Sequence, residues 1–297
     1  MGSHSHHQEE VEVHDFRGAN DANGANGASL SRQVTVTLSP ADYERLFFQP
    51  NQAKGDLSKR LGNPTLIGLL GFVIPFQATV FCLLDFQGAN STSLTAASGA
   101  FYYVGGIAMN LAGIFEMIIG NTFPGSVFIV YGCHWAQTGY ASDPLHNLSG
   151  TYTSAAGVSG LLSQQYNSGN GMYHLSMCFT SFVFFLGSLR TNAPLSMAIF
   201  CLVPLFALLA ASDFYIGYNP TAEGMAHAAY LLKIGGCFGF VAMLCAWYLC
   251  IISVCASTGV PCPLPIFDLS NKFAPKGEAA MREHAGANSM PPDDDKA

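Results

Sequence analysis

Charge is scarce in this chain of 297 residues, because only 10% of them are Asp, Glu, Lys or Arg, whereas 50% are hydrophobic. A soluble domain carries about 25% charged residues. The shortage of charge therefore excludes an ordinary soluble domain and predicts an all-α integral membrane protein. No run of Lys or Arg is present, so the sequence predicts no nucleic-acid partner.

The sequence also lacks the motifs of metal and catalytic sites. It has nine cysteines, but none is in a CxxC pair or in the Cys/His spacing of a zinc site. All except Cys262 lie within or beside apolar stretches, where cysteine behaves as a small apolar residue. No nucleophile–base pair is recognisable. The sequence therefore predicts no metal, no cofactor and no enzymatic activity.

Long apolar runs dominate the middle of the chain. Two of them, 101–120 and 124–141, form a hairpin around a short turn, and each is close to the roughly 20 residues that cross a bilayer. Four further runs bring the total to six predicted transmembrane helices, the others being 62–85, 171–188, 194–216 and 225–256.

The hairpin contains polar side chains that lipid does not favour. They are Asn110, Glu116, Tyr131, His134 and Gln137. A polar group at membrane depth must face protein or a water-filled path. The hairpin therefore predicts a membrane protein with an internal polar route.

The composition divides the chain into four parts. Residues 1–32 are poor in large apolar side chains and are predicted to be a disordered tail. Residues 33–60 are predicted to contain an amphipathic helix on the cytoplasmic membrane surface. Residues 61–260 form the six-span domain, and 261–297 form a cytoplasmic C-terminal tail.

The positions of Lys and Arg predict the orientation. With six spans, all 12 except Lys233 fall on one side, which the positive-inside rule identifies as the cytoplasm. Both termini are then cytoplasmic. Asn90 and Asn147 begin N-x-Ser/Thr sequons in loops that this topology puts outside, so both are candidate glycosylation sites.

Several motifs resemble one known family. The start of the first run, Asn63-Pro64-Thr65 followed by Gly68-Leu69-Leu70-Gly71-Phe72, is similar to the signature of the acetate uptake transporter family, which comprises six-span acetate/succinate–proton symporters. The resemblance runs from 38 to 256, is strongest to the fungal-type branch, and includes Gly120-Asn121-Thr122-Phe123, Tyr131-Gly132, Ser188-Leu189-Arg190-Thr191-Asn192 and Ala246-Trp247-Tyr248.

The resemblance implies a constriction and a recognition segment. Phe72, Tyr131 and Leu202 correspond to the side chains that narrow the family's pore. Apolar rings there would accept a methyl group, while a hydroxyl or backbone N–H groups would bind a carboxylate. The resemblance also implies a substrate-recognition role for Asn63, Pro64 and Thr65, against the alternative of a plain helix start, and a pore-adjacent position for Ala246.

Two titratable residues on the hairpin each have two possible roles. Glu116 and His134 are candidates for gating or proton-linked roles. The alternatives are a fixed structural hydrogen bond for Glu116 and hydrogen-bonded packing for His134. The chain departs from the family pattern at Leu66, Ile129, Val130 and His134, and two hydroxyls are lost at Ile129 and Val130.

The function that the resemblance implies is transport of acetate and related short-chain carboxylates across the plasma membrane by a homo-oligomer, a hexamer in this family. Moving an anion into an inside-negative cell costs about 2.3 kcal/mol per charge per 100 mV. Carrying a proton with each carboxylate removes this cost, so proton symport is the favoured mode. The alternatives are an acetate-selective anion channel and a non-transporting membrane sensor or scaffold of the same fold.

Overall fold

The computed structural model describes residues 61–269 and residue 272. The predictions for 1–32 and 33–60, and most of the predicted tail 261–297, lie outside the described residues.

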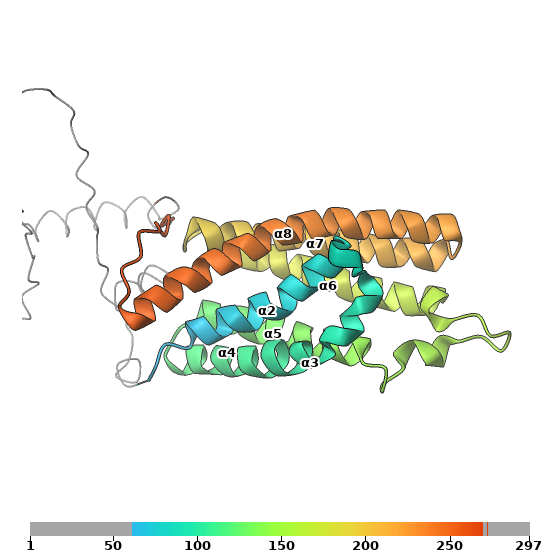
Figure 1. Ribbon diagram of the computed structural model, residues 1–297, viewed down its shortest axis with the longest axis horizontal. Helices are drawn as coiled ribbons and strands as arrows, with labels where there is room; N and C mark the ends of the chain where they lie inside the picture. Colours follow the sequence, from blue (N-terminus) through green and yellow to red (C-terminus); the bar gives the residue numbers. More distant parts are fainter. Residues whose placement is uncertain (1–60, 270–271, 273–297) are drawn as a thin grey trace, which may run out of the picture. The chain divides into compact units, whose positions relative to one another are not determined.

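Helices account for nearly all of the regular structure in the described part of the chain (Figure 1). The six long segments are α2 (Thr65–Leu83), α4 (Met109–Ile118), α5 (Thr122–Ser142), α6 (Gln164–Ser188), α7 (Ala193–Tyr218) and α8 (Ala222–Thr258). Short helical turns η2 (Phe86–Gly88), η3 (Ser91–Ala97), α3 (Ser98–Ala100) and the π-helical η4 (Phe101–Ala108) lead into α4, while η5 (Leu148–Tyr152) and η6 (Gly160–Leu162) lie between α5 and α6.

Local sequence explains where the later helices begin and end. The Asn192 side chain accepts a hydrogen bond from the Leu195 N–H at 2.9 Å and caps α7. Thr221 caps α8 in the same way, and Ser163 caps α6. Helix α8 ends at Gly259, whose φ of 72° is the left-handed conformation that glycine adopts without a Cβ clash.

Four helical segments are long and apolar enough to cross a membrane. They are α2, the continuous run Ser91–Ile118, α7 and α8. Helices α5 and α6 have 21 and 25 residues but are less apolar. Polar side chains such as Gln137 on α5 and Asn170 on α6 account for the difference. The structure thus confirms a helical membrane protein and supports four of the six predicted spans by length and composition.

The helices pack mainly as neighbours along the chain. Helix α7 packs along α6 and α8, α4 packs on α5, and α2 packs on α8 (Figure 1). The Trp247 Nε1–H donates to Gln77 Oε1 at 2.7 Å and so joins α8 to α2. The backbones of α5 and α6 approach each other at few points. Side chains therefore fill the space between them, and they leave part of it empty.

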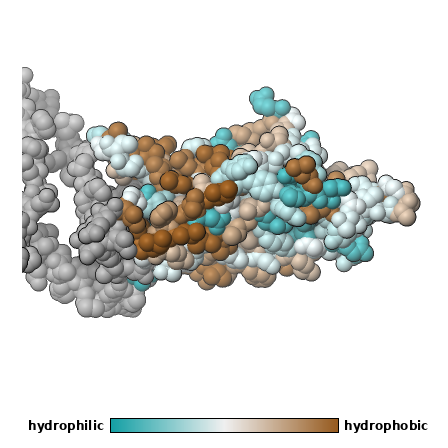
Figure 2. All heavy atoms as spheres, turned by 90° about the horizontal axis from the view of Figure 1, so that it is seen from below, coloured by the Kyte–Doolittle hydropathy of each residue, from teal (hydrophilic) through white to brown (hydrophobic). Residues whose placement is uncertain are grey.

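The described surface is strongly apolar on its sides. Large hydrophobic side chains are exposed along most of the long helices, among them Ile107, Phe179 and Tyr230. Figure 2 shows such side chains gathered over one part of the helices, whereas polar side chains gather toward the end that carries the connection between α5 and α6. Exposed apolar surface of this extent is expected where lipid or another subunit covers the protein.

The first residues of the predicted C-terminal tail are ordered against the turn between α6 and α7. The Ala193 N–H donates to the Phe267 carbonyl at 3.0 Å, and the Leu269 N–H donates to the Thr191 carbonyl at 2.9 Å. The Tyr248 hydroxyl also donates to the Pro265 carbonyl at 2.6 Å. These contacts place 261–269 at one end of the helices, beside the start of α7.

Candidate functional site

A cavity of about 190 Å³ lies among α2, α5, α6 and α7. Its walls are mostly apolar and aromatic, with a few polar groups, as is typical of small-molecule sites. The lining side chains include Phe72, Phe76, Thr79, Leu83, Tyr131, His134, Trp135, Thr138, Asn170, Tyr173, His174, Leu202, Leu205, Phe206 and Leu209.

The three residues expected at a constriction line this cavity together. Phe72 is the first lining residue on α2, Tyr131 the first on α5 and Leu202 the first on α7. The lining then continues along these helices to 83, 142 and 209, toward the end that carries the connection between α5 and α6. Phe72, Tyr131 and Leu202 therefore form the floor of the cavity, and below it these three helices contribute no lining residue.

Aromatic packing closes the floor from below. Tyr131 and Leu202 are each 2% exposed. The rings of Phe72 and Tyr131 lie with centroids 5.9 Å apart, and the Phe184 ring of α6 packs edge-on against Tyr131 at 5.8 Å. The Tyr131 hydroxyl is 3.0 Å from Ser181 Oγ. That hydroxyl already has a protein partner, so the most evident contribution of Tyr131 to the floor is its ring.

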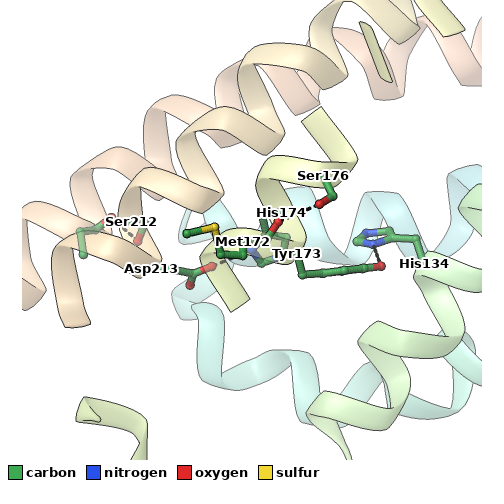
Figure 3. A network of polar contacts seen from close by, with 8 residues as sticks. His134, Met172, Tyr173, His174, Ser176, Ser212 and Asp213 are labelled. Carbon is green, nitrogen blue, oxygen red and sulfur yellow. Dashed lines mark hydrogen bonds and ion pairs between the residues drawn. The ribbon is translucent and has the colours of Figure 1, made fainter. Parts of the chain in front are cut away.

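Two histidines line the cavity above the floor. His134 follows Tyr131 by three residues, a rise of about 4.5 Å along the helix. Its Nδ1 is 2.9 Å from the Tyr173 hydroxyl of α6. His174, the next residue on α6, has its Nδ1 2.6 Å from Asp213 Oδ2 of α7 (Figure 3). Polar groups on α5, α6 and α7 are thus joined in pairs around the upper wall of the cavity.

Glu116 lies in the last turn of α4 and does not line the cavity. It is fully buried, and its Oε1 accepts a hydrogen bond from Thr65 Oγ1 at 2.6 Å. Its Oε2 accepts one from Asn121 Nδ2, also at 2.6 Å. The carboxylate therefore ties the start of α2 to the turn that precedes α5. This geometry matches the structural alternative for Glu116 and leaves its gating role a prediction.

The proposed recognition segment is placed at the start of α2. Asn63 is exposed, whereas Pro64 and Thr65 are buried. Asn63 Oδ1 accepts the Thr65 N–H at 2.9 Å, so one of the free N–H groups of this helix end is already occupied. None of the three residues lines the cavity.

The remaining candidates are spread over the molecule. Ala246 is buried on α8 and is not among the cavity-lining residues. Asn90 and Asn147 are both exposed, and Asn90 also caps η3. Lys233 pairs with Asp85 at 2.8 Å, an exposed ion pair that contributes roughly 0–1 kcal/mol. Among the described residues, no group of three or more His, Cys, Asp or Glu side chains could hold a metal ion.

Sequence reasoning gave too little weight to one pair. Neither His174 nor Asp213 is among the candidate site residues predicted from the sequence. The available signal was the sequence of α7, where Asp213 is the only charged residue among 26. A single carboxylate on an apolar membrane helix is expected to pair with another polar or charged group.

These features define a multi-pass helical membrane protein with a small internal cavity. The chain matches the GPR1/FUN34/yaaH family over residues 47–271, and it belongs to that family.

Relatives and a solved structure agree with this assignment. The protein alcS of Aspergillus fumigatus is 33% identical over 248 residues, covering 82% of this chain and 89% of that protein. Acetate permease A of Emericella nidulans is 26% identical over 233 residues, covering 78% and 74% respectively. The structure of the bacterial acetate channel SatP is 24% identical, with a TM-score of 0.54, and covers 69% of this chain and 99% of that one. At this identity the likeness to SatP establishes the fold.

Proposed function

We propose that this chain is a plasma-membrane transporter for acetate and related short-chain carboxylates. The observation that carries the proposal is the floor of the cavity, where Phe72, Tyr131 and Leu202 come together from three helices. Large side chains from separate helices converge in this way where they shape a shared path. The family membership and the name of one relative, acetate permease A, support a carboxylate as the solute.

The size and character of the cavity suit a small amphiphilic anion. Its volume of about 190 Å³ is below the roughly 300–1,000 Å³ of pockets for drug-sized ligands. The aromatic floor accepts a methyl group. The polar groups above it, among them Thr138, Asn170 and the two histidines, offer hydrogen bonds to the charged end.

We further propose six membrane spans, formed by α2, the run Ser91–Ile118, α5, α6, α7 and α8, with both termini in the cytoplasm. The lower apolarity of α5 and α6 is consistent with this arrangement, because these two helices supply polar residues to the cavity wall. The cavity then extends toward the outside, and its floor separates it from the cytoplasmic half. The exposed apolar sides of the helices support a homo-oligomer, a hexamer by family resemblance.

Proton symport is the proposed mode, because coupled movement of one proton and one monocarboxylate is electroneutral. An acetate-selective channel is the second candidate, favoured by the fold shared with a protein named a channel. A non-transporting sensor or scaffold is the third, favoured by the loss of hydroxyls at Ile129 and Val130.

Labelled acetate uptake into cells that express the protein, with and without a proton uncoupler, separates these functions. A symporter should give uptake above that of cells carrying an empty vector, and the uncoupler should abolish accumulation. A channel should let acetate equilibrate without accumulating it against its gradient. Surface-expressed protein that gives no uptake above the control cells would contradict the transport proposal.

A further inference from the structure

The pair formed by His174 and Asp213 has features of a proton-binding site. The two side chains come from α6 and α7 and are 2.6 Å apart at His174 Nδ1 and Asp213 Oδ2. They are 22% and 20% exposed, so neither side chain is fully enclosed by protein. His174 also lines the cavity. The pair thus connects a titratable group with the proposed route of the carboxylate.

The charge distribution makes His174 the local partner of the Asp213 carboxylate. Helices α2, α4, α5, α6 and α7 contain no Lys or Arg, and their only acidic residues are Glu116 and Asp213. Glu116 lies in the last turn of α4 and does not line the cavity. Among the groups of these helices at the cavity, only a protonated imidazole can neutralise Asp213.

The hydrogen bond fixes which nitrogen of His174 titrates. An ionised carboxylate can only accept hydrogen bonds, so Nδ1 of His174 must carry a hydrogen and donate it to Asp213. The other nitrogen, Nε2, has no hydrogen-bond partner among the described residues. Nε2 is therefore the atom that takes up or releases a proton.

The groups facing His174 are few. Helix α5 brings His134, which is held by the Tyr173 hydroxyl, and α7 brings Asp213 (Figure 3). The rings of His134 and His174 both pack against Phe206, at 5.1 and 6.4 Å. The lining residues of α2 are not titratable, and Lys233 of α8 is paired with Asp85.

We infer that His174, held by Asp213, carries the proton that crosses with each carboxylate, at a site in the cavity wall above the Phe72–Tyr131–Leu202 floor. This inference rests on the proposed transport function and assigns its coupling residue. A proton from water on the cavity side bonds to the Nε2 lone pair of His174. The new N–H donates a charge-assisted hydrogen bond to the incoming carboxylate. When the carboxylate leaves past the floor, it takes the Nε2 proton with it as the neutral acid: the N–H bond breaks as the O–H bond of the acid forms, Nε2 regains its lone pair, and no net charge crosses.

The charges explain why proton and anion bind together. Without the proton, the neutral ring offers a lone pair, and the negative Asp213 repels an incoming anion. With the proton, the His174–Asp213 pair is neutral overall and presents an N–H. Each ligand therefore raises the affinity of the site for the other, and the enhancement is reciprocal.

The experiment measures protons and acetate in the same proteoliposomes. A trapped pH-sensitive dye reports proton uptake and labelled acetate reports substrate uptake, with protein-free liposomes subtracted to remove diffusion of acetic acid. The purified wild type is compared with His174→Gln, with the nearly isosteric Asp213→Asn, and with His227→Gln. His227 is the matched control, because it is an exposed histidine of α8 that does not line the cavity. Gel filtration and thermal melting verify the fold of each variant.

The wild type and His227→Gln should carry one proton with each acetate. In His174→Gln and Asp213→Asn, acetate flux should fall, and the flux that remains should carry clearly less than one proton per acetate. A merely structural role would lower the flux but leave the ratio at one, which would overturn the inference. Complete loss of flux in both variants with normal melting would also overturn it, since the pair would then belong to the permeation path itself. Wild-type flux without protons would overturn the inference and leave transport standing, whereas no wild-type flux at all would contradict transport.

Discussion

Shortening Leu202 to alanine should widen the floor of the cavity. Leu202→Ala removes the branched end of a side chain that is 2% exposed and lies beside Phe72 and Tyr131 in the cavity floor. Each buried methylene contributes about 0.8 kcal/mol. Part of that contact is made with neighbouring helices, so acetate should lose roughly 1–2 kcal/mol of recognition. At about 1.4 kcal/mol per tenfold change, the KM for acetate should rise about five- to thirtyfold.

The assay is competition of labelled acetate uptake by a size series of acids, such as propionate, lactate, succinate and benzoate. Acids that do not compete in the wild type should compete in Leu202→Ala, because the floor sets the largest solute that passes. Leu249→Ala is the matched control. Leu249 is a buried leucine of α8 that is 1% exposed and does not line the cavity. Both leucine-to-alanine variants should lose about 2–5 kcal/mol of folding stability, but Leu249→Ala should leave the size limit unchanged.

An unchanged size limit in Leu202→Ala, at normal surface expression, would remove Leu202 from the path. It would also weaken the proposed role of the floor as a whole. A limit that widened equally in Leu249→Ala would attribute the effect to a loosened bundle and not to the floor.

Three further changes test other parts of the account. Tyr131→Phe should lower acetate transport no more than Ser181→Ala does, since the Tyr131 hydroxyl is bonded to Ser181; a much larger effect of Tyr131→Phe in uptake assays would mean that the hydroxyl binds the carboxylate itself. Glu116→Gln places an amide N–H₂ against one of the two buried donors, Thr65 Oγ1 or Asn121 Nδ2. The protein should therefore lose about 1–3 kcal/mol of folding stability and melt at a lower temperature. An unchanged melting curve would refute the tie between α2 and the α4–α5 turn. Expression in a eukaryotic host should attach glycan to Asn90 or Asn147, with an endoglycosidase shifting the band, whereas labelling of a cysteine in the α5–α6 connection from the cytoplasm would contradict the topology.

The apolar runs of the sequence predicted the long helices well. The run at 194–216 became α7 (Ala193–Tyr218), and the run at 225–256 became α8 (Ala222–Thr258). Length and hydrophobicity determine these helices locally, and capping residues such as Asn192 determine their ends. The start of the run Ser91–Ile118 was not predicted, because its 3-10 and π-helical turns leave no regular hydrophobic pattern in the sequence. In the π-helical part, a Cβ at Gly105 would meet the Trp135 side chain, a contact between separate segments that the sequence does not show.

The candidate site was partly predictable. The family motifs located Phe72, Tyr131 and Leu202, and the structure brings all three to one cavity. The pairing of His174 with Asp213 was not predictable, because the two residues are 39 positions apart on different helices. Their contact depends on how α6 and α7 are rotated about their axes, and that rotation is set by packing along their whole length. The ordered conformation of 261–269 could not be predicted for a similar reason, because its hydrogen bonds are made with the turn before α7, which is distant in sequence.

Exchange of labelled acetate across proteoliposomes that contain only the purified protein is the most direct test of a carboxylate path through the cavity. The assay compares the wild type with Phe72→Trp, in which a larger ring fills the space above the floor. The account predicts that wild-type liposomes exchange acetate well above protein-free liposomes, and that Phe72→Trp removes most of this exchange while the protein remains folded. Wild-type exchange no faster than that of protein-free liposomes, or exchange through Phe72→Trp at the wild-type rate, would contradict it.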